Sequence, residues 1–211
     1  MQNNSREEIL NKIAAVRSKR IAAIDIQPSD TEEIYKLILP DSVTCFKNEL
    51  EAINGQCILC ENEVDLFQKL KVFIHSQNIP SIYCRDSNIV ELLASVEIPV
   101  SADPDNFESM QAGITACEFL VARTGSVIVS SASESGRQMN VFPPVHIVIA
   151  HASQLIDYLG DALIAIQNKY GINLPSTIST ITGPSRTADI EKTLVLGAHG
   201  PKEFIVFLSK T

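Results

Sequence analysis

Short apolar runs alternate with helix-like stretches over most of this chain. The apolar runs are rich in β-branched residues and predict strands over 57–60, 82–84, 126–130, 145–150, 177–182 and 204–208. The spacing of apolar positions between them predicts helices over 64–76, 88–94 and 153–170. The run 145–150 is nearly all apolar, as a central strand covered on both faces should be. The alternation therefore predicts an α/β fold: a three-layer, mostly parallel sheet with helices on both faces.

The first 45 residues have a different pattern. Ile9, Ile13 and Val16 recur at helical spacing among charged residues, which predicts an amphipathic helix over 5–24. A Pro-Ser-Asp turn follows, and a second short helix is expected to stop before Pro40. We therefore expect residues 1–45 to form a helical arm and residues 46–211 to form the α/β domain. The arm covers either an edge of the domain or a partner subunit, and the sequence leaves both open.

Composition narrows the classes of function. The 211 residues carry a net charge of −8, which argues against nucleic acid and anionic membranes as partners. No apolar run approaches the roughly 20 residues that span a bilayer, and the N-terminus has no secretory pattern. Five cysteines at irregular spacing indicate reduced thiols. We therefore expect a cytoplasmic globular protein.

No metal or cofactor pattern emerges. Cys57 and Cys60 form a C-x-x-C, but in a strand their side chains point to opposite faces, so buried thiols are expected rather than a shared metal. His146 and His151 lie at the two ends of one predicted strand and face opposite sides of it. His151 is a candidate site residue because ligand crevices form at the carboxyl ends of parallel strands. Dinucleotide and P-loop fingerprints are also absent.

Two loops have the composition of an anion site. After the predicted strand 177–182 come Gly183, Ser185, Arg186 and Thr187, and a short helix with Asp189 in its first turn is expected next. Backbone N–H groups at a helix start, together with an arginine, suit a carboxylate or a phosphate. The alternative is that this segment binds no anion and that Thr187 is an ordinary N-cap residue of the helix. The sequence leaves both interpretations open.

The second loop surrounds the predicted strand 126–130. Thr124, Gly125 and Ser126 lead into this strand, and a Ser-rich segment ending at Arg137 follows it. Such a segment either cradles an anion or is simply solvated. In a parallel sheet this loop and the 183–187 loop would leave from the same edge. We therefore predict one anion-binding cleft, with Arg137 and Arg186 as its cations.

In that cleft, Ser185 and Thr187 would donate hydrogen bonds and Asp189 would orient Arg186 or a substrate hydroxyl. His199, within Gly197–Pro201, would lie at the rim. Arg186→Ala is expected to weaken anion binding about ten- to a hundredfold. If Arg186 instead pairs with Asp189 or Glu191 to hold the turn, only stability would change.

The same two regions resemble a known family. The segments GPSRTADIE and GAHGP within residues 183–201 resemble the C-terminal signature of the LUD domain family, the family of lactate utilisation protein C. Residues 113–149 resemble its central motif. This chain has Arg123 where the family usually has an acidic residue, and Ser126 where it usually has threonine. The resemblance implies a fold like that of sugar-phosphate isomerases and CoA-transferases.

The resemblance also implies a function. Family members act with iron–sulfur partner subunits that convert L-lactate to pyruvate, so this chain would be a non-redox subunit that binds a small carboxylate or holds the complex together. A free-standing enzyme, similar to a CoA-transferase or to formyltetrahydrofolate cyclo-ligase, is the alternative. Acyl transfer needs a glutamate, for which Glu118 and Glu134 are the candidates near the central motif. A scaffold without any ligand is a third reading, and turnover by the chain alone and homo-oligomerisation stay open.

Overall fold

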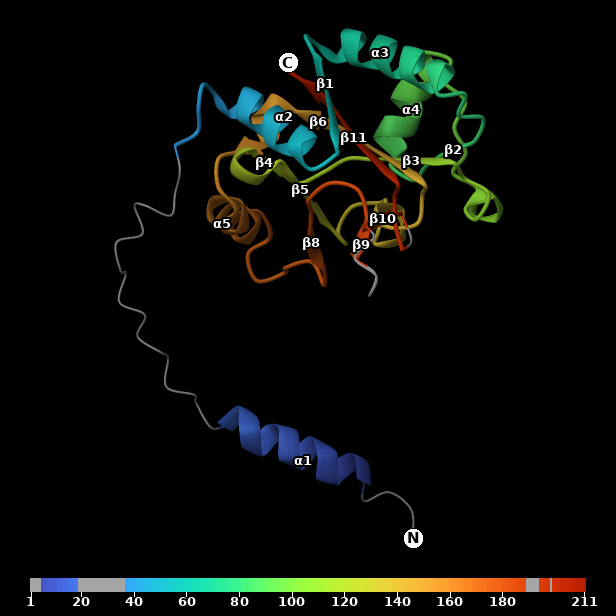
Figure 1. Cartoon of the computed structure of the whole chain (residues 1–211). Helices are drawn as coiled ribbons and strands as arrows, with labels where there is room; N and C mark the ends of the chain where they lie inside the picture. Colours follow the sequence, from blue (N-terminus) through green and yellow to red (C-terminus); the bar gives the residue numbers. More distant parts are fainter. Residues whose placement is uncertain (1–4, 19–36, 189–193, 198) are drawn as a thin grey trace. The chain divides into compact units, whose positions relative to one another are not determined.

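The computed structural model describes residues 5–18, 37–188, 194–197 and 199–211, and it divides the chain into the units Met1–Lys36 and Leu37–Thr211. In the first unit, α1 spans Ser5–Ser18 (Figure 1). Its Ile9 and Ile13 side chains are about half exposed. The helix predicted over 5–24 is therefore described as far as Ser18, whereas most of the second predicted helix lies outside the described residues.

The second unit begins ahead of the boundary expected between residues 45 and 46. That boundary falls inside α2, which spans Ser42–Ala52 and starts where the Asp41 side chain accepts a hydrogen bond from the backbone N–H of Thr44 at 2.9 Å. Phe46 and Leu50 of this helix are fully buried. The helix is therefore part of the α/β unit.

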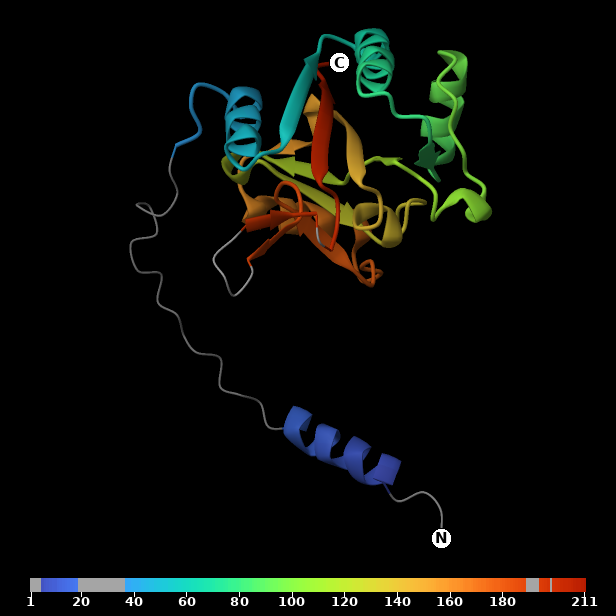
Figure 2. The ribbon, with the colours of Figure 1, turned by 45° about the vertical axis from the view of Figure 1, so that its right-hand side comes forward.

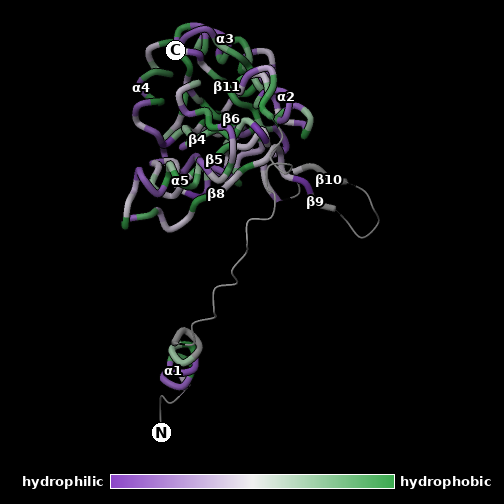
Figure 3. Tube along the Cα trace, turned by 90° about the vertical axis from the view of Figure 1, so that its left-hand side faces the viewer, coloured by the Kyte–Doolittle hydropathy of each residue, from purple (hydrophilic) through white to green (hydrophobic). Residues whose placement is uncertain are grey.

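A five-stranded parallel sheet forms the centre of this unit (Figure 1). Its order is β1 (Gln56–Cys60), β11 (Glu203–Ser209), β6 (Val145–His151), β3 (Ala112–Thr115) and β2 (Ile82–Cys84), and every neighbouring pair is parallel. The central strands β6 and β11 pair along their whole length. Both are among the most hydrophobic stretches of the unit (Figure 3).

Two helices cover one face of the large sheet. They are α3 (Glu63–Ser76) and α4 (Ser87–Ser95), capped by the side chains of Asn62 and Asp86. Apolar side chains such as Leu70 and Leu93 pack from these helices against the sheet. The cap residues fix where each helix starts, since their side-chain oxygens accept backbone N–H groups of the first turn.

The other face is covered by α2 and by a second, four-stranded sheet (Figure 2). The order of that sheet is β7 (Leu155–Ile156), β4 (Phe119–Val121), β5 (Ser126–Ser130) and β8 (Ile178–Ile181). The outer face of this second sheet packs against α5 (Leu159–Tyr170). Short 3-10 helices are found at η2 (Pro104–Asn106), η3 (Ala122–Thr124), η4 (Gln138–Asn140) and η5 (Ala152–Gln154).

The α/β class and the mostly parallel sheet predicted from the sequence are confirmed. The second sheet, in which β5 runs antiparallel to β4 and β8, was not predicted. The helix predicted from residue 153 begins only at Leu159. The side chain of Gln154 holds the preceding residues in another conformation, because its amide oxygen accepts from the backbone N–H of His151 and its amide nitrogen donates to the carbonyl of Cys117. Within the described residues, no helix is long and apolar enough to cross a membrane.

The helix predicted after Thr187 is not found where the structure describes this segment, and residues 189–193, which were expected to form its first turns, lie outside the described residues. Residues Arg186–Ala188 form β9, which pairs antiparallel with β10 (Leu194–Leu196). Helix-cap residues are a local signal, whereas a helix of about ten residues has little stability of its own. The apolar, β-prone Leu-Val-Leu run of β10 favours strand pairing instead.

Candidate functional site

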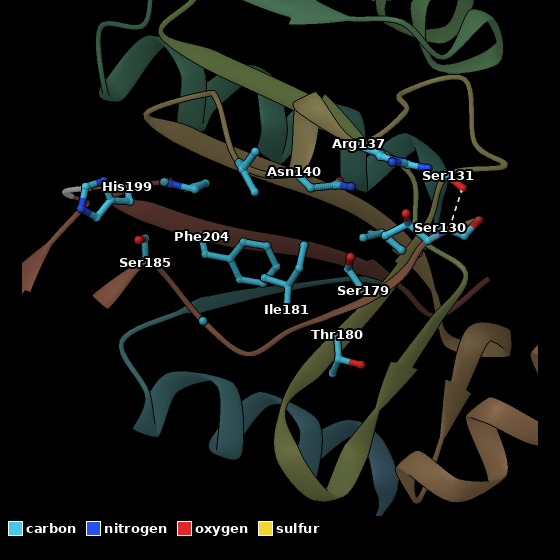
Figure 4. A pocket seen from close by; sticks show the side chains of 16 residues that line it. Ser130, Ser131, Arg137, Asn140, Ser179, Thr180, Ile181, Ser185, His199 and Phe204 are labelled. Atoms are coloured by element: carbon cyan, nitrogen blue, oxygen red, sulfur yellow. Dashed lines mark hydrogen bonds between the residues drawn. The ribbon is translucent and has the colours of Figure 1, made fainter. Parts of the chain in front are cut away.

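A cleft of about 310 Å³ lies along β5 and β8 of the second sheet (Figure 4). Its lining combines the two motifs that the sequence singled out. The described lining residues are Val129, Ser130, Ser131, Arg137, Asn140, Val141, Thr177, Ser179, Thr180, Ile181, Gly183, Ser185, His199, Gly200, Pro201 and Phe204. The motifs are thus brought to one cleft, although they are far apart in the chain.

The geometry of the cleft differs from the prediction. The two loops were expected to leave the same edge of a parallel sheet, but β5 and β8 are antiparallel, with Ser130 opposite Ile178 and Val127 opposite Ile181. The loop after β5 and the loop after β8 therefore start at opposite ends of this strand pair, about 10 Å apart. Figure 4 shows Arg137 at one end of the cleft and His199 at the other, with Phe204 between them.

Arg137 supplies the positive charge of the described lining. It is exposed, and its Nη2 donates to Ser176 Oγ at 2.6 Å. The segment before it is attached to the β8 side, because Ser131 N donates to the carbonyl of Thr177 at 2.9 Å and Thr177 N donates to Ser131 Oγ at 3.1 Å. A guanidinium has five N–H donors, so Arg137 keeps donors for an anion in the cleft.

Arg186 points elsewhere. Its Nη2 donates to the carbonyl of Ile53, at the end of α2, and it does not contribute to the described lining of the cleft. Thr187 lies in β9, and Asp189 lies outside the described residues. Of the C-terminal motif, the cleft is lined by Gly183, Ser185 and His199. The structure thus gives Arg186 a role in attaching the turn to α2.

Thr124, Gly125 and Ser126 are also absent from the described lining. Ser126 Oγ lies 2.8 Å from both Thr124 Oγ1 and Thr182 Oγ1. Gly125, at φ +58°, packs directly on the backbone of α2. This segment therefore holds α2 against the second sheet. Arg123 adds an ion pair with Glu49 of α2 at 3.1 Å, which accounts for a basic residue at this position.

A side-chain cluster beside the cleft was not found by sequence reasoning. Glu118 is only 8% exposed and accepts three hydrogen bonds: from Ser130 Oγ at 2.5 Å, Lys169 Nζ at 2.7 Å and the Tyr170 hydroxyl at 2.6 Å. Burial acts to raise the pKa of Glu118, but these three hydrogen bonds outweigh it and hold the pKa below its ordinary value. The sequence offered Glu118 as a candidate, but its partners Lys169 and Tyr170 come from the end of α5.

Comparison with known proteins now places the chain. The sequence profile of the LUD domain matches residues 100–209, just over half of the chain. The chain belongs to the LUD domain family.

Related proteins agree with this placement. Lactate utilization protein C of Bacillus subtilis is 28% identical to this LUD domain protein over 93% of this chain and 92% of that one. The protein of the same name from Geobacillus thermodenitrificans is 38% identical over 46% of this chain and 41% of that one. A crystal structure of a DUF162 family protein from Deinococcus radiodurans has a TM-score of 0.60 at 15% identity, covering 80% of this chain and 96% of that one, which supports the fold.

The two glutamates that the sequence offered for acyl transfer are both engaged in this LUD domain. Glu134 accepts from the backbone N–H of Ser87 at 2.6 Å and from its hydroxyl at 3.1 Å, and these bonds lower the pKa of Glu134. It thereby attaches the loop of Arg137 to the start of α4. Glu118 is held by the three donors named above. An acyl anhydride on either carboxylate would disrupt these hydrogen bonds.

The cysteines and histidines of the LUD domain are separated. Cys57 packs with α2 on one face of the large sheet and Cys60 packs with α3 on the other, and burial raises the pKa of these thiols to about 12 and about 11. His151 lines a cavity of about 240 Å³ beside α3 and α4, together with Glu63 and Gln154. Within the described residues, no three His, Cys, Asp or Glu side chains converge as metal ligands would.

Proposed function

We propose that this protein serves lactate utilisation as a cytoplasmic, non-redox subunit that binds a small carboxylate in the cleft beside β5 and β8. Membership of the LUD domain family and the names of its relatives support the process. The binding role rests on one observation: Arg137, which is permanently positively charged, is among the described residues that line the cleft. The carboxylate would be held at the Arg137 end of the cleft.

The rest of the lining suits such a ligand. Arginine presents a planar fork that pairs with both oxygens of a carboxylate. The hydroxyls of Ser131 and Ser179 supply further polar partners, and Val129, Ile181 and Phe204 supply an apolar wall for a short carbon chain. A site with a few placed polar groups on an apolar wall is typical for small molecules.

Oxidation of the bound acid would fall to iron–sulfur partner subunits. The sequence of this chain has neither cluster-ligand spacing nor a nucleotide fingerprint. Affinity purification of the endogenous protein from lactate-grown cells is therefore expected to retain iron–sulfur proteins. Recovery of the protein without them, under anaerobic conditions that preserve the clusters, would contradict this part of the proposal.

Arg137→Ala is expected to weaken carboxylate binding about ten- to a hundredfold, because a charge-assisted hydrogen bond contributes about 1.5–3 kcal/mol. Arg186→Ala is the matched control: this arginine is also exposed and also donates to an oxygen of the protein, but it does not line the cleft. Calorimetric titration with L-lactate, pyruvate and phosphate measures both variants. Equal losses of affinity in the two variants, or none in Arg137→Ala, would refute the assignment.

A further inference from the structure

A second cavity, of about 260 Å³, lies against the cleft. The two share Val129 and Ser130 as lining residues. The second cavity is otherwise lined by residues that include Cys117, Glu118, Lys169 and Tyr170, none of which lines the first cleft. One water takes about 30 Å³ in the liquid, so the space admits a molecule of several heavy atoms.

Glu118 lines this cavity and has one acceptor position left. Its lowered pKa keeps the carboxylate ionised at neutral pH. An ionised carboxylate has about four lone-pair positions, and the donors from Ser130, Lys169 and Tyr170 fill three of them. The remaining lone-pair position of Glu118 can accept a hydrogen bond from a donor group of a ligand, such as a hydroxyl.

Lys169 offers the complementary donors. The hydrogen bond to Glu118 raises the pKa of Lys169, which keeps the amine cationic. Lys169 Nζ donates one hydrogen bond to Glu118 Oε2 at 2.7 Å, and its ammonium group has two further N–H donors. Its side chain is 53% exposed whereas that of Glu118 is 6% exposed, so the free donors of the lysine are accessible at the mouth of the cavity.

We propose that this cavity is a second ligand site, which takes a small 2-hydroxy carboxylate whose hydroxyl donates to Glu118 and whose carboxylate accepts from Lys169. Glu118 and Lys169 lie next to each other, as do the hydroxyl and the carboxylate of a 2-hydroxy acid, so the acceptor and the donor of the protein match the donor and the acceptor of the ligand. Glu118 and Lys169 together carry no net charge, so a monoanion is favoured over a phosphate dianion beside the buried carboxylate. Burial raises the pKa of the Cys117 thiol to about 12, so this thiol stays protonated and takes no covalent part.

A purely structural role is the competing explanation. The cluster joins the end of α5 to the end of β5, and such a link needs no ligand. The two explanations differ in what Lys169→Met does: loss of a structural link lowers the melting temperature alone, whereas loss of a ligand site removes the binding that depends on the hydroxyl group.

The test compares L-lactate with propionate, which has the same carboxylate and no hydroxyl. Calorimetric titration of the wild-type protein is expected to show two molecules of L-lactate and one of propionate per chain. Lys169→Met is expected to bind one molecule of L-lactate, with the affinity for propionate unchanged. Arg137→Ala is expected to bind one L-lactate with unchanged affinity and to bind propionate about ten- to a hundredfold more weakly, which separates this site from the proposed carboxylate site in the cleft.

Two further variants make the test decisive. Lys210→Met removes a lysine of similar exposure, 49%, that pairs with Glu61 at 2.7 Å on the surface, and it should bind both acids like the wild type. Ala132→Leu narrows the second cavity without touching the ion pair, and it should abolish the second L-lactate even if Lys169→Met fails to fold. Two bound L-lactate molecules in Ala132→Leu, or equal stoichiometry for the two acids in the wild type, would overturn the proposal.

Discussion

Gly125→Ala is expected to destabilise the α/β unit by on the order of 3–5 kcal/mol, a large part of the roughly 5–15 kcal/mol that stabilises an ordinary domain. A Cβ at this position would lie 2.2 Å from the backbone nitrogen of Leu50 and 2.6 Å from the carbonyl carbon of Glu49. Real Cβ atoms do not come that close to a backbone, so α2 would have to move off η3. The left-handed φ of +58° adds about 1–2 kcal/mol of strain for alanine.

Gly136 provides a control, because its backbone has a similar left-handed φ but a Cβ there would contact no other part of the protein. Its φ is +62°, and nothing lies within 4 Å of the position that a Cβ would take. Gly136→Ala should therefore cost only the strain, a shift in melting temperature of roughly 2–8 °C, whereas Gly125→Ala should lose at least twice as much or fail to fold. Thermal unfolding followed by circular dichroism distinguishes them. Similar melting temperatures for the two variants would mean that the contact of Gly125 with α2 is unimportant.

Acidification is expected to destabilise the protein through His146. This side chain is fully buried, its Nε2 lies 2.9 Å from Thr115 Oγ1, and burial lowers the pKa of His146 to about 3. The unfolded chain takes up a proton near pH 6.5, but the folded state does not until about pH 3. This contribution to stability is thus complete above pH 6.5 and is lost as the pH falls, by about 2 kcal/mol at pH 5.0.

The measurement is urea unfolding at pH 7.5 and pH 5.0, for the wild type and for His146→Gln. Glutamine retains a polar partner for Thr115 but does not titrate, so the variant is expected to have nearly the same stability at both values of pH. The range ends at pH 5.0 because carboxylates such as Glu118, whose pKa is lowered by folding, cost stability only in stronger acid. An equal loss in both proteins would assign the pH dependence to another group.

The secondary structure could be predicted wherever the signal is local. The strands β1, β2, β5, β6 and β11 follow apolar runs, and α3 and α4 follow helical spacing with cap residues at their starts. Of the described strands, those that were missed are β3, β4, β7, β9 and β10. They have two to four residues, a length at which a pattern seldom stands out. The helix predicted after Thr187 had good cap residues, but in the described part of that segment Arg186–Ala188 pair with Leu194–Leu196 as strands.

The candidate site could be predicted in part, because the residue types of its two motifs are also a local feature of the sequence. The sequence pointed to Arg137, Gly183, Ser185 and His199, which line the cleft together. It could not show that β5 and β8 are antiparallel, and so it placed the two loops at one edge. Motif membership also does not give side-chain direction, which is why Arg186 was assigned to the cleft although it reaches Ile53.

The position of β11 between β1 and β6 has a consequence for synthesis in the cell. β1 is complete at residue 60, but β11, its neighbour among the described strands of the large sheet, starts at residue 203. At about 5–20 residues per second, the ribosome needs roughly 7 to 30 s to make the segment between them. β1 lacks its partner strand throughout that interval, and one edge of β6 lacks its partner from residue 151 onward. The nascent chain is therefore expected to depend on chaperones until β11 leaves the ribosome.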